Sequence, residues 1–330
     1  MIKIFEYHRR GPILRHPLLP CLSSYHTINL TNGCPNRCVY CYAQCYGHHP
    51  GWGKIIFYSN TLELLKEELP KKRQTPELVY FSTASEPFLP VEPILKDLHD
   101  IMEILFHHGV FILVSTKCVI PDSFIELFSR NPDKVHIQVG MTTPDDGIRR
   151  LLEPNAADVP ERLDNLKRLI HSGIRTELRM DPLVPGLTDT LDSFMSLLGK
   201  MAELKVKNAV ASYLFMRPGI EAPKRLSYGD WSFYPMAKKL YKHRVTDYCG
   251  HGVIWIPTTE YRKEKYALLK DIAASHGISL NLCRCKNKDL TKECCHPEAP
   301  AIPSQNQLSF LESGQEQMMD TNGLDGQGGE

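Results

Sequence analysis

The chain alternates short apolar runs with segments in which hydrophobic residues recur every three to four positions. The apolar runs are rich in Val, Ile, Phe and Tyr, as buried strands are, and the periodic segments between them predict helices. Six strands are predicted, at 27–31, 78–82, 110–115, 135–140, 175–180 and 209–214. Successive strand–helix units predict parallel strands with right-handed crossovers, but periodicity leaves open whether the sheet curls into a barrel or stays flat.

The predicted helices carry residues that favour a helix start or end. Asn60 and Glu63 have the spacing of a capping box ahead of a helix at 61–69. A helix at 92–108 has one continuous apolar face and ends at Gly109, a residue type that favours helix C-termini. Two more helices are expected, one between Asp158 and Gly173 and one at 192–204.

The pattern changes after residue 215. Strands are predicted at 253–256 and 279–282, with a helix at 261–275 between them. From Pro297 onward Pro, Ser, Gln, Gly and acidic residues dominate, as in disordered segments. The sequence therefore predicts four parts: an N-terminal extension at 1–25, an α/β domain at 26–215, a small C-terminal α/β extension at 216–296 and a disordered acidic tail at 297–330.

Composition is that of an ordinary globular protein, with 42% hydrophobic and 23% charged residues among 330. No apolar run is long enough for a transmembrane helix, and residues 1–15 lack the apolar core of a secretory signal, so we expect a cytoplasmic protein. The net charge of +1 conceals an asymmetry, because residues 297–330 hold six acids and no Lys or Arg. Residues 1–296 therefore carry 39 basic against 32 acidic residues, or +7, which suits a polyanionic partner or an ordinary solvated surface equally.

Eleven cysteines are many for a cytoplasmic protein, where disulfides are rare and clustered cysteines more often bind metal. The first cluster places Cys34, Cys38 and Cys41 in a CxxxCxxC spacing directly after the first predicted strand. Three thiolates can bind three irons of a 4Fe–4S cluster and leave the fourth iron open for a ligand. Zinc is the alternative, since it usually takes four protein ligands and Cys45 would supply the fourth.

The second cluster stands at the end of the predicted folded region. Four thiols lie close together there: Cys283, Cys285, Cys294 and Cys295. In a reducing compartment this density predicts a second metal site, either an auxiliary iron–sulfur cluster or a structural zinc.

The segment CPNRCVYCY at 34–42 resembles the motif of the radical S-adenosylmethionine (SAM) superfamily. The resemblance implies a partial (β/α)6 barrel in which SAM chelates the open iron through its amine and carboxylate. One electron, from a donor such as flavodoxin or ferredoxin, then cleaves SAM to a 5′-deoxyadenosyl radical that abstracts hydrogen from a substrate. The expected fold class is therefore α/β: a partial radical SAM barrel with a small C-terminal extension and a disordered tail.

A narrower resemblance, over residues 24–215, is to the spore photoproduct lyase group, often called DNA repair photolyases. It rests on the order and spacing of INLTNGCP at 28–35, CYA at 41–43, FST at 81–83, STK at 115–117, TTPD at 142–145 and LEP at 152–154. In that group Tyr42 matches a tyrosine implicated in radical return. Spore photoproduct lyases also carry a hydrogen-donating cysteine after the second strand. Here the loop at 82–87 has none and Cys118 is the nearest candidate, which puts repair of the spore thymine dimer in doubt.

Polar residues follow the ends of several predicted strands, where a ligand at the mouth of a barrel would bind. The candidates for contact with SAM are Ser82, Thr83, Glu86, Lys117, Thr142 and Arg179. Arg179 is the best carboxylate partner, because a guanidinium can bind in a bidentate way. Turn chemistry explains Ser and Thr at strand ends equally well.

The leading hypothesis is a radical SAM lyase-like enzyme acting on a nucleic-acid base, in DNA repair or modification. Four aromatic residues suit base stacking but equally suit a core: Tyr40, Tyr42, Tyr46 and Phe88. The alternatives are a radical SAM enzyme on RNA, a peptide or a small molecule, and a zinc-stabilised binding module. The apolar island from Gln307 to Leu311 resembles the peptide by which repair proteins bind the sliding clamp. DNA and the clamp are thus candidate partners, and a membrane is not.

Overall fold

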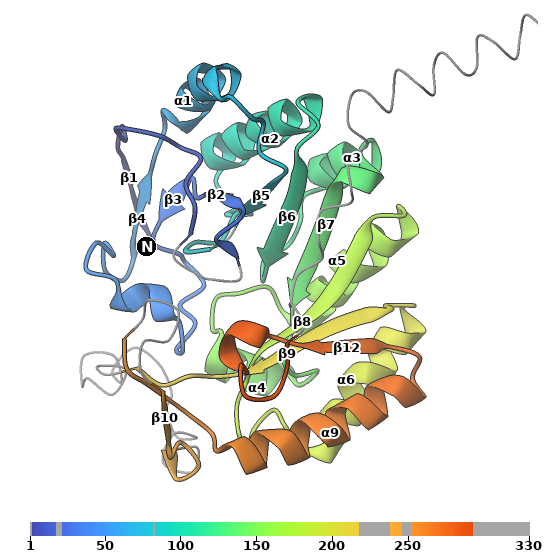
Figure 1. The fold of residues 1–330 in the computed structure, drawn as a ribbon. Helices are drawn as coiled ribbons and strands as arrows, with labels where there is room; N and C mark the ends of the chain where they lie inside the picture. The colour runs from blue at the N-terminus through green and yellow to red at the C-terminus, as the bar shows by residue number, and fades with distance from the viewer. Residues whose placement is uncertain (1, 18–21, 82, 218–237, 246–251, 293–330) are drawn as a thin grey trace, which may run out of the picture. The chain divides into compact units, whose positions relative to one another are not determined.

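The computed structural model describes residues 2–17, 22–81, 83–217, 238–245 and 252–292. Within these residues seven strands form one parallel sheet, in the order β12-β9-β8-β7-β6-β5-β2. The strands are β2 (His26–Ile28), β5 (Leu78–Phe81), β6 (Phe111–Thr116), β7 (Val135–Gly140), β8 (Arg175–Leu183), β9 (Asn208–Tyr213) and β12 (Ser279–Leu282). The sheet is open between β2 and β12, as in a partial barrel, so the expected fold class is confirmed (Figure 1).

Helices follow the strands and lie along one side of the sheet (Figure 1). They are α1 (Thr61–Glu68), α2 (Glu92–His107), α3 (Asp122–Ser129), α4 (Asp146–Leu152), α5 (Val159–His171), α6 (Leu191–Glu203) and α9 (Thr259–Ser275). The capping box at the start of α5 joins Asp158 and Glu161, which fixes where that helix begins. The apolar faces of these helices and of the strands share one hydrophobic core, including Leu98, Ile112 and Leu166.

The inner side of the sheet is polar and hydrogen-bonded from strand to strand. Tyr80 Oη lies 2.7 Å from Ser115 Oγ, and the Ser115 hydroxyl donates to Gln138 Oε1 at 2.7 Å. Gln138 in turn donates to Glu177 Oε2 at 2.7 Å. Because side chains alternate along each strand, the other positions of these strands face the helices and are apolar. This ladder gives the side chains of Ser115, Gln138 and Glu177 hydrogen-bond partners inside the barrel.

The N-terminal region forms a small sheet that the sequence pattern did not predict. Its strands, in the order β1-β4-β3, are β1 (Lys3–Glu6), β4 (Lys54–Phe57) and β3 (Thr31–Asn32). The predicted strand at 27–31 is therefore divided between β2 and β3. Asn60 is the N-cap residue of α1, as predicted, but its side chain makes no capping bond. It instead accepts from Arg9 N at 2.9 Å and donates to Arg9 O at 3.0 Å.

The C-terminal segment adds to the main sheet. β12 pairs with β9, and α9 packs against β12 and α6. A short antiparallel pair, β10 (His243–Val245) with β11 (Ile254–Ile256), lies between β9 and α9 in the chain. Residues 1–295 group as one compact unit, and the division into parts at 1–25, 26–215 and 216–296 stays a prediction. The predicted tail, 297–330, is outside the described residues.

Candidate functional site

A cavity of about 200 Å³ opens at the carboxyl ends of the strands, room for far more than one water molecule (about 30 Å³). Its wall combines the cysteine loop with residues that follow β5 and β6 and with the carboxyl-terminal half of β8. The chemically active members of the lining are Cys34, Cys38, Cys41, Tyr42, Glu86, Lys117, Arg179, Asp181 and Lys286. The carboxyl ends of parallel strands meet at this edge, which is where α/β barrels build their sites.

The cysteine loop is held in place by its backbone. Gly33 has φ +89°, and a Cβ there would lie 2.5 Å from the carbonyl oxygen of Lys54, so only glycine fits. Val39 N donates to Leu152 O at 2.9 Å, which ties the loop to the end of α4. Asn155 Nδ2 donates to Pro35 O at 2.8 Å, which fixes the loop's other half. These bonds direct all three cysteines of the motif into one cavity.

The three thiols of the motif share one cavity, which Cys34, Cys38 and Cys41 all line. Three thiolates are the ligand set of a 4Fe–4S cluster with one open iron, whereas a structural zinc usually takes four protein ligands. Burial raises the pKa of Cys34 and of Cys38, so binding of iron would displace their protons.

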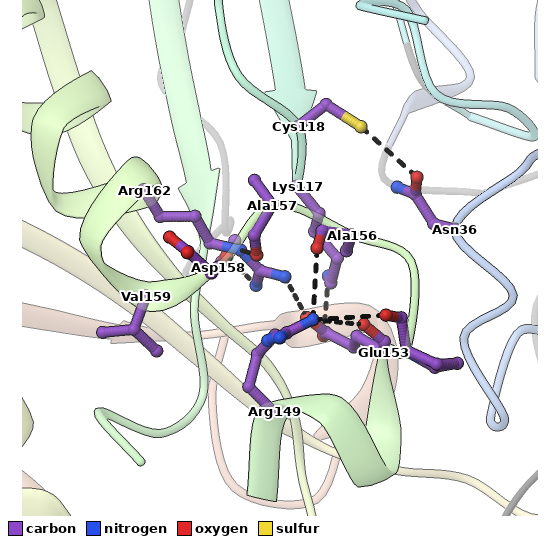
Figure 2. A network of polar contacts seen from close by, with 12 residues as sticks. Asn36, Lys117, Cys118, Arg149, Glu153, Ala156, Ala157, Asp158, Val159 and Arg162 are labelled. Carbon is purple, nitrogen blue, oxygen red and sulfur yellow. Dashed lines mark hydrogen bonds and ion pairs between the residues drawn. The ribbon is translucent and has the colours of Figure 1, made fainter. Parts of the chain in front are cut away.

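A buried ion network lies directly behind the loop (Figure 2). Glu153 is 2% exposed, and its carboxylate lies 2.5 Å from the Arg162 guanidinium, which is 1% exposed. Tyr40 donates its hydroxyl to Glu153, and Lys117 Nζ lies 3.8 Å from the same carboxylate. Burial alone would raise the pKa of Glu153, but Arg162 and Lys117 hold it below its ordinary value. The network fixes Tyr40 and Lys117 in the wall of the cavity.

A second ion network brings in the C-terminal segment. Asp181 accepts from Arg179 Nη2 at 2.8 Å and from Lys286 Nζ, which also donates to Ser212 Oγ at 3.1 Å. Although burial opposes it, Lys286 and Arg179 hold the pKa of Asp181 well below its usual range. Sequence reasoning did not place Lys286 in the site, since only the pairing of β12 with β9 carries it there.

The structure distributes the predicted SAM contacts unevenly. Glu86, Lys117 and Arg179 line the cavity. Glu86 accepts from Thr116 Oγ1 at 2.5 Å and from Lys117 N at 3.0 Å, and burial raises its pKa. Thr83 instead turns its hydroxyl to Asn29 Nδ2, 2.8 Å away, and Thr142 is buried apart from the lining. Ser82 lies outside the described residues.

Tyr42 and Cys118, the predicted radical-transfer residues, have different surroundings. Tyr42 lines the cavity, donates its hydroxyl to Thr83 O at 2.6 Å and stacks on Phe215 with ring centroids 6.2 Å apart. Cys118 is buried outside the lining and donates to Asn36 Oδ1 at 3.3 Å, behind the cysteine loop (Figure 2). The geometry therefore favours Tyr42 over Cys118 as a group that meets a substrate.

The second cysteine cluster is only partly described. Cys283 and Cys285 are buried in an apolar cluster with Phe215 and Ile256, against which Tyr42 packs. Cys294 and Cys295 lie outside the described residues. For Phe88 the core alternative holds, because it is buried and meets Phe124 edge-on with ring centroids 5.1 Å apart.

Comparison with known proteins identifies relatives of this chain. The radical SAM superfamily model matches residues 28–198. The chain is 26% identical over 267 residues to a radical SAM Nα-GlyT isomerase of Pseudomonas phage M6, covering 80% of this chain and 54% of that protein. It is 28% identical over 173 residues to an uncharacterized protein of Methanocaldococcus jannaschii, covering 50% and 62%. The chain thus spans between half and two thirds of the length of these curated relatives.

Solved structures agree on the fold. Spore photoproduct lyase in complex with dinucleoside spore photoproduct superposes with a TM-score of 0.63 at 14% identity, over 84% of this chain and 82% of that one. In the part of the chain that the structure describes, no helix is both long and apolar enough to cross a membrane. Because the family model matches more than half of the chain, and the cysteine loop and partial barrel have the expected form, this protein belongs to the radical SAM superfamily.

Proposed function

We propose that this chain cleaves SAM at a 4Fe–4S cluster held by Cys34, Cys38 and Cys41 and acts on a nucleic-acid base. The observation that carries the proposal is the convergence of these three thiols on a cavity lined by strand-end polar groups. Bound to the cluster, SAM supplies a 5′-deoxyadenosyl radical that abstracts hydrogen from the substrate. The chain itself orients both ligands and shields them from water.

The polar lining contributes two groups of residues with different tasks. Glu153 holds Lys117, which would present a cation to the carboxylate of SAM. Arg179 and Lys286, two cations around the one carboxylate of Asp181, form a positively charged edge that offers donors and acceptors to a substrate. Tyr42, with its hydroxyl already oriented toward Thr83 O, is the group placed to return a hydrogen atom.

A nucleobase suits the aromatic part of the cavity. Tyr42 and Phe215 lie nearly parallel, with an angle of 30° between their planes, and both line the cavity, so they offer a flat face to a base. The dinucleoside bound to the similar lyase supports a substrate of this class. Whether the reaction is an elimination, an isomerisation or another radical step follows from the substrate.

The test uses anaerobically reconstituted protein with dithionite, SAM and deuterated DNA, RNA or peptide digest in separate reactions. Mass spectrometry of 5′-deoxyadenosine reads out both SAM cleavage and the origin of the abstracted atom. Deuterium transfer from DNA is the expected result. Transfer only from RNA or only from peptide would replace the proposed substrate class, and absence of 5′-deoxyadenosine in every reaction would refute the enzyme assignment.

We also propose a second metal site at the C-terminal cysteines, as an iron–sulfur cluster or zinc. Cys283 and Cys285, two positions apart in the sequence, are both buried in the apolar cluster that contains Phe215 and against which Tyr42 packs. Reconstituted wild-type protein should hold more metal than one 4Fe–4S cluster accounts for. The double variant C283A/C285A should lose that excess and keep the EPR signal of the first cluster.

This prediction is tested by measuring the metal content of the two proteins. The variant C118A is the control for the loss of a buried cysteine elsewhere. Equal metal content in wild type and double variant would show that these thiols bind no metal.

Three kinds of partner stay proposals: a flavodoxin or ferredoxin as electron donor, DNA, and a sliding clamp bound through Gln307 to Leu311. That peptide lies outside the described residues.

A further inference from the structure

A second cavity, of about 370 Å³, lies between the N-terminal segment and the loop that follows β5. The N-terminal segment forms one wall, and residues from the start of the barrel form the other. Its charged and aromatic lining consists of Arg9, Arg10, Arg15, Tyr7, Tyr58 and His48. We call it the arginine groove. Nothing in the radical chemistry of the cysteine cavity uses it.

The arginine groove is strongly cationic, and the carboxylate of Glu68 beside it is bonded to the backbone N–H of Ile13 rather than to an arginine. No Asp or Glu is among its described lining residues, and within the described chain no carboxylate lies at ion-pair distance from the three guanidiniums. Arg9 lies over the Tyr58 ring, 3.9 Å from its centroid, while its Nε is buried without a hydrogen-bond partner. Burial, together with the charge of Arg15, lowers the pKa of Arg9 to about 10. A bound anion would relieve both the repulsion and the missing partner.

Exposed aromatic side chains stand beside these cations. On and just after the edge strand β1, Phe5 is 48% and Tyr7 59% exposed, and Tyr7 meets Tyr58 edge-on with centroids 6.2 Å apart. Lys3 and Lys54, paired across β1 and β4, add exposed positive charge to the same small sheet. Cationic grooves interleaved with exposed aromatic rings are typical of surfaces that bind single-stranded nucleic acid.

The arginine groove adjoins the cysteine cavity. Ala84 lines both. Arg9 Nη2 donates to Asn29 O at 2.5 Å, and the Asn29 side chain accepts from Ala84 N at 3.1 Å. Only the loop after β5 therefore separates the guanidiniums from the site of the proposed radical reaction.

We propose that the arginine groove binds the phosphates of a single-stranded nucleic acid through Arg9, Arg10 and Arg15, with Phe5 and Tyr7 stacking on bases. A strand held there passes the loop after β5 and presents a neighbouring base to the cysteine cavity. This inference rests on the proposed function, in which the substrate is a nucleic-acid base. A duplex fits less well, because its bases already stack on one another and must leave the stack to reach a cavity.

The test measures binding of a fluorescein-labelled 12-nucleotide oligomer to reconstituted full-length protein by anisotropy, over a series of NaCl concentrations. Arg10 and Arg15 are exposed, so R10Q/R15Q leaves packing intact. Its affinity at low salt should fall roughly tenfold, and the slope of log K against log salt should decrease by about 1.4, or about 0.7 for each lost phosphate contact. The control R130Q/R175Q removes two exposed arginines at the opposite ends of the strands and should bind as wild type does.

A second variant separates stacking from charge. Tyr7→Leu should weaken binding about fivefold or more and leave the salt slope unchanged, because it removes a ring and no charge. The proposal is overturned if the wild-type protein does not bind the oligomer, or if R10Q/R15Q keeps its affinity and salt slope. It is also overturned if the control loses as much affinity, if Tyr7→Leu binds as tightly as wild type, or if a duplex binds equally tightly. Binding requires no SAM cleavage, so this result is independent of whether 5′-deoxyadenosine forms.

Discussion

Replacing Cys34, Cys38 or Cys41 by alanine is expected to abolish SAM cleavage. Each change removes one of three iron ligands, and no other cysteine that the structure describes lines the cavity and could substitute for it. A 4Fe–4S cluster with two protein ligands has two exposed irons and is lost or converted to smaller species. The measurements are iron and sulfide content, the EPR spectrum of the reduced protein with and without SAM, and 5′-deoxyadenosine after addition of dithionite.

Cys45→Ala is the matched control, because it changes a cysteine of the same loop outside the CxxxCxxC spacing. If the loop holds a cluster, this variant should keep iron and form 5′-deoxyadenosine at the wild-type rate. If the loop holds zinc with four sulfur ligands, Cys45→Ala should lose metal as readily as the other three. Full cleavage activity in any of the three motif variants would remove the basis of the proposed reaction.

Glu153→Gln should be the most destabilising single change in the buried networks, at about 3–5 kcal/mol of unfolding free energy. The variant leaves the Arg162 guanidinium, 1% exposed, without its counter-charge, and also weakens the contacts that fix Tyr40 and Lys117. Urea titration followed by circular dichroism gives the change. Glu103→Gln, which removes an exposed carboxylate 3.9 Å from Arg130, is the control and should cost no more than about 1 kcal/mol.

The same carboxylate predicts a pH dependence. The folded-state pKa of Glu153 is depressed, so its contribution to stability is present above the unfolded-state pKa and is lost as pH falls through the folded value. Wild-type protein should therefore lose stability below about pH 4.5 more steeply than Glu153→Gln does. Two outcomes would show that Glu153 is not a charged partner of Arg162. One is the same dependence of unfolding free energy on pH in both proteins, and the other is a smaller loss of stability in Glu153→Gln than in the control Glu103→Gln.

Local pattern was sufficient for the main elements and for the first cysteine cluster. β7 occupies the predicted residues 135–140, and α5 begins at the predicted Asp158 cap, because strand burial and capping are properties of neighbouring residues. The capping bond expected of Asn60 is absent for the converse reason, since its side chain binds Arg9, 51 residues away in the chain. The small N-terminal sheet was missed for the same reason, because β1 is exposed and pairs with the distant β4.

By itself the sequence determined the family, the cysteines that would hold the cluster and the succession of parallel strands, since the CxxxCxxC spacing and the hydrophobic periodicity are local. Only the tertiary structure decided what surrounds the cluster. Glu153 meets Tyr40, 113 residues earlier, and Lys286 reaches Asp181, 105 residues earlier, because the carboxyl ends of parallel strands gather at one edge of the sheet. The arginine groove likewise exists because the N-terminal segment folds back over the loop after β5. A buried charge needs a partner, and the sequence shows which residues are charged but not which distant residues will pair with them.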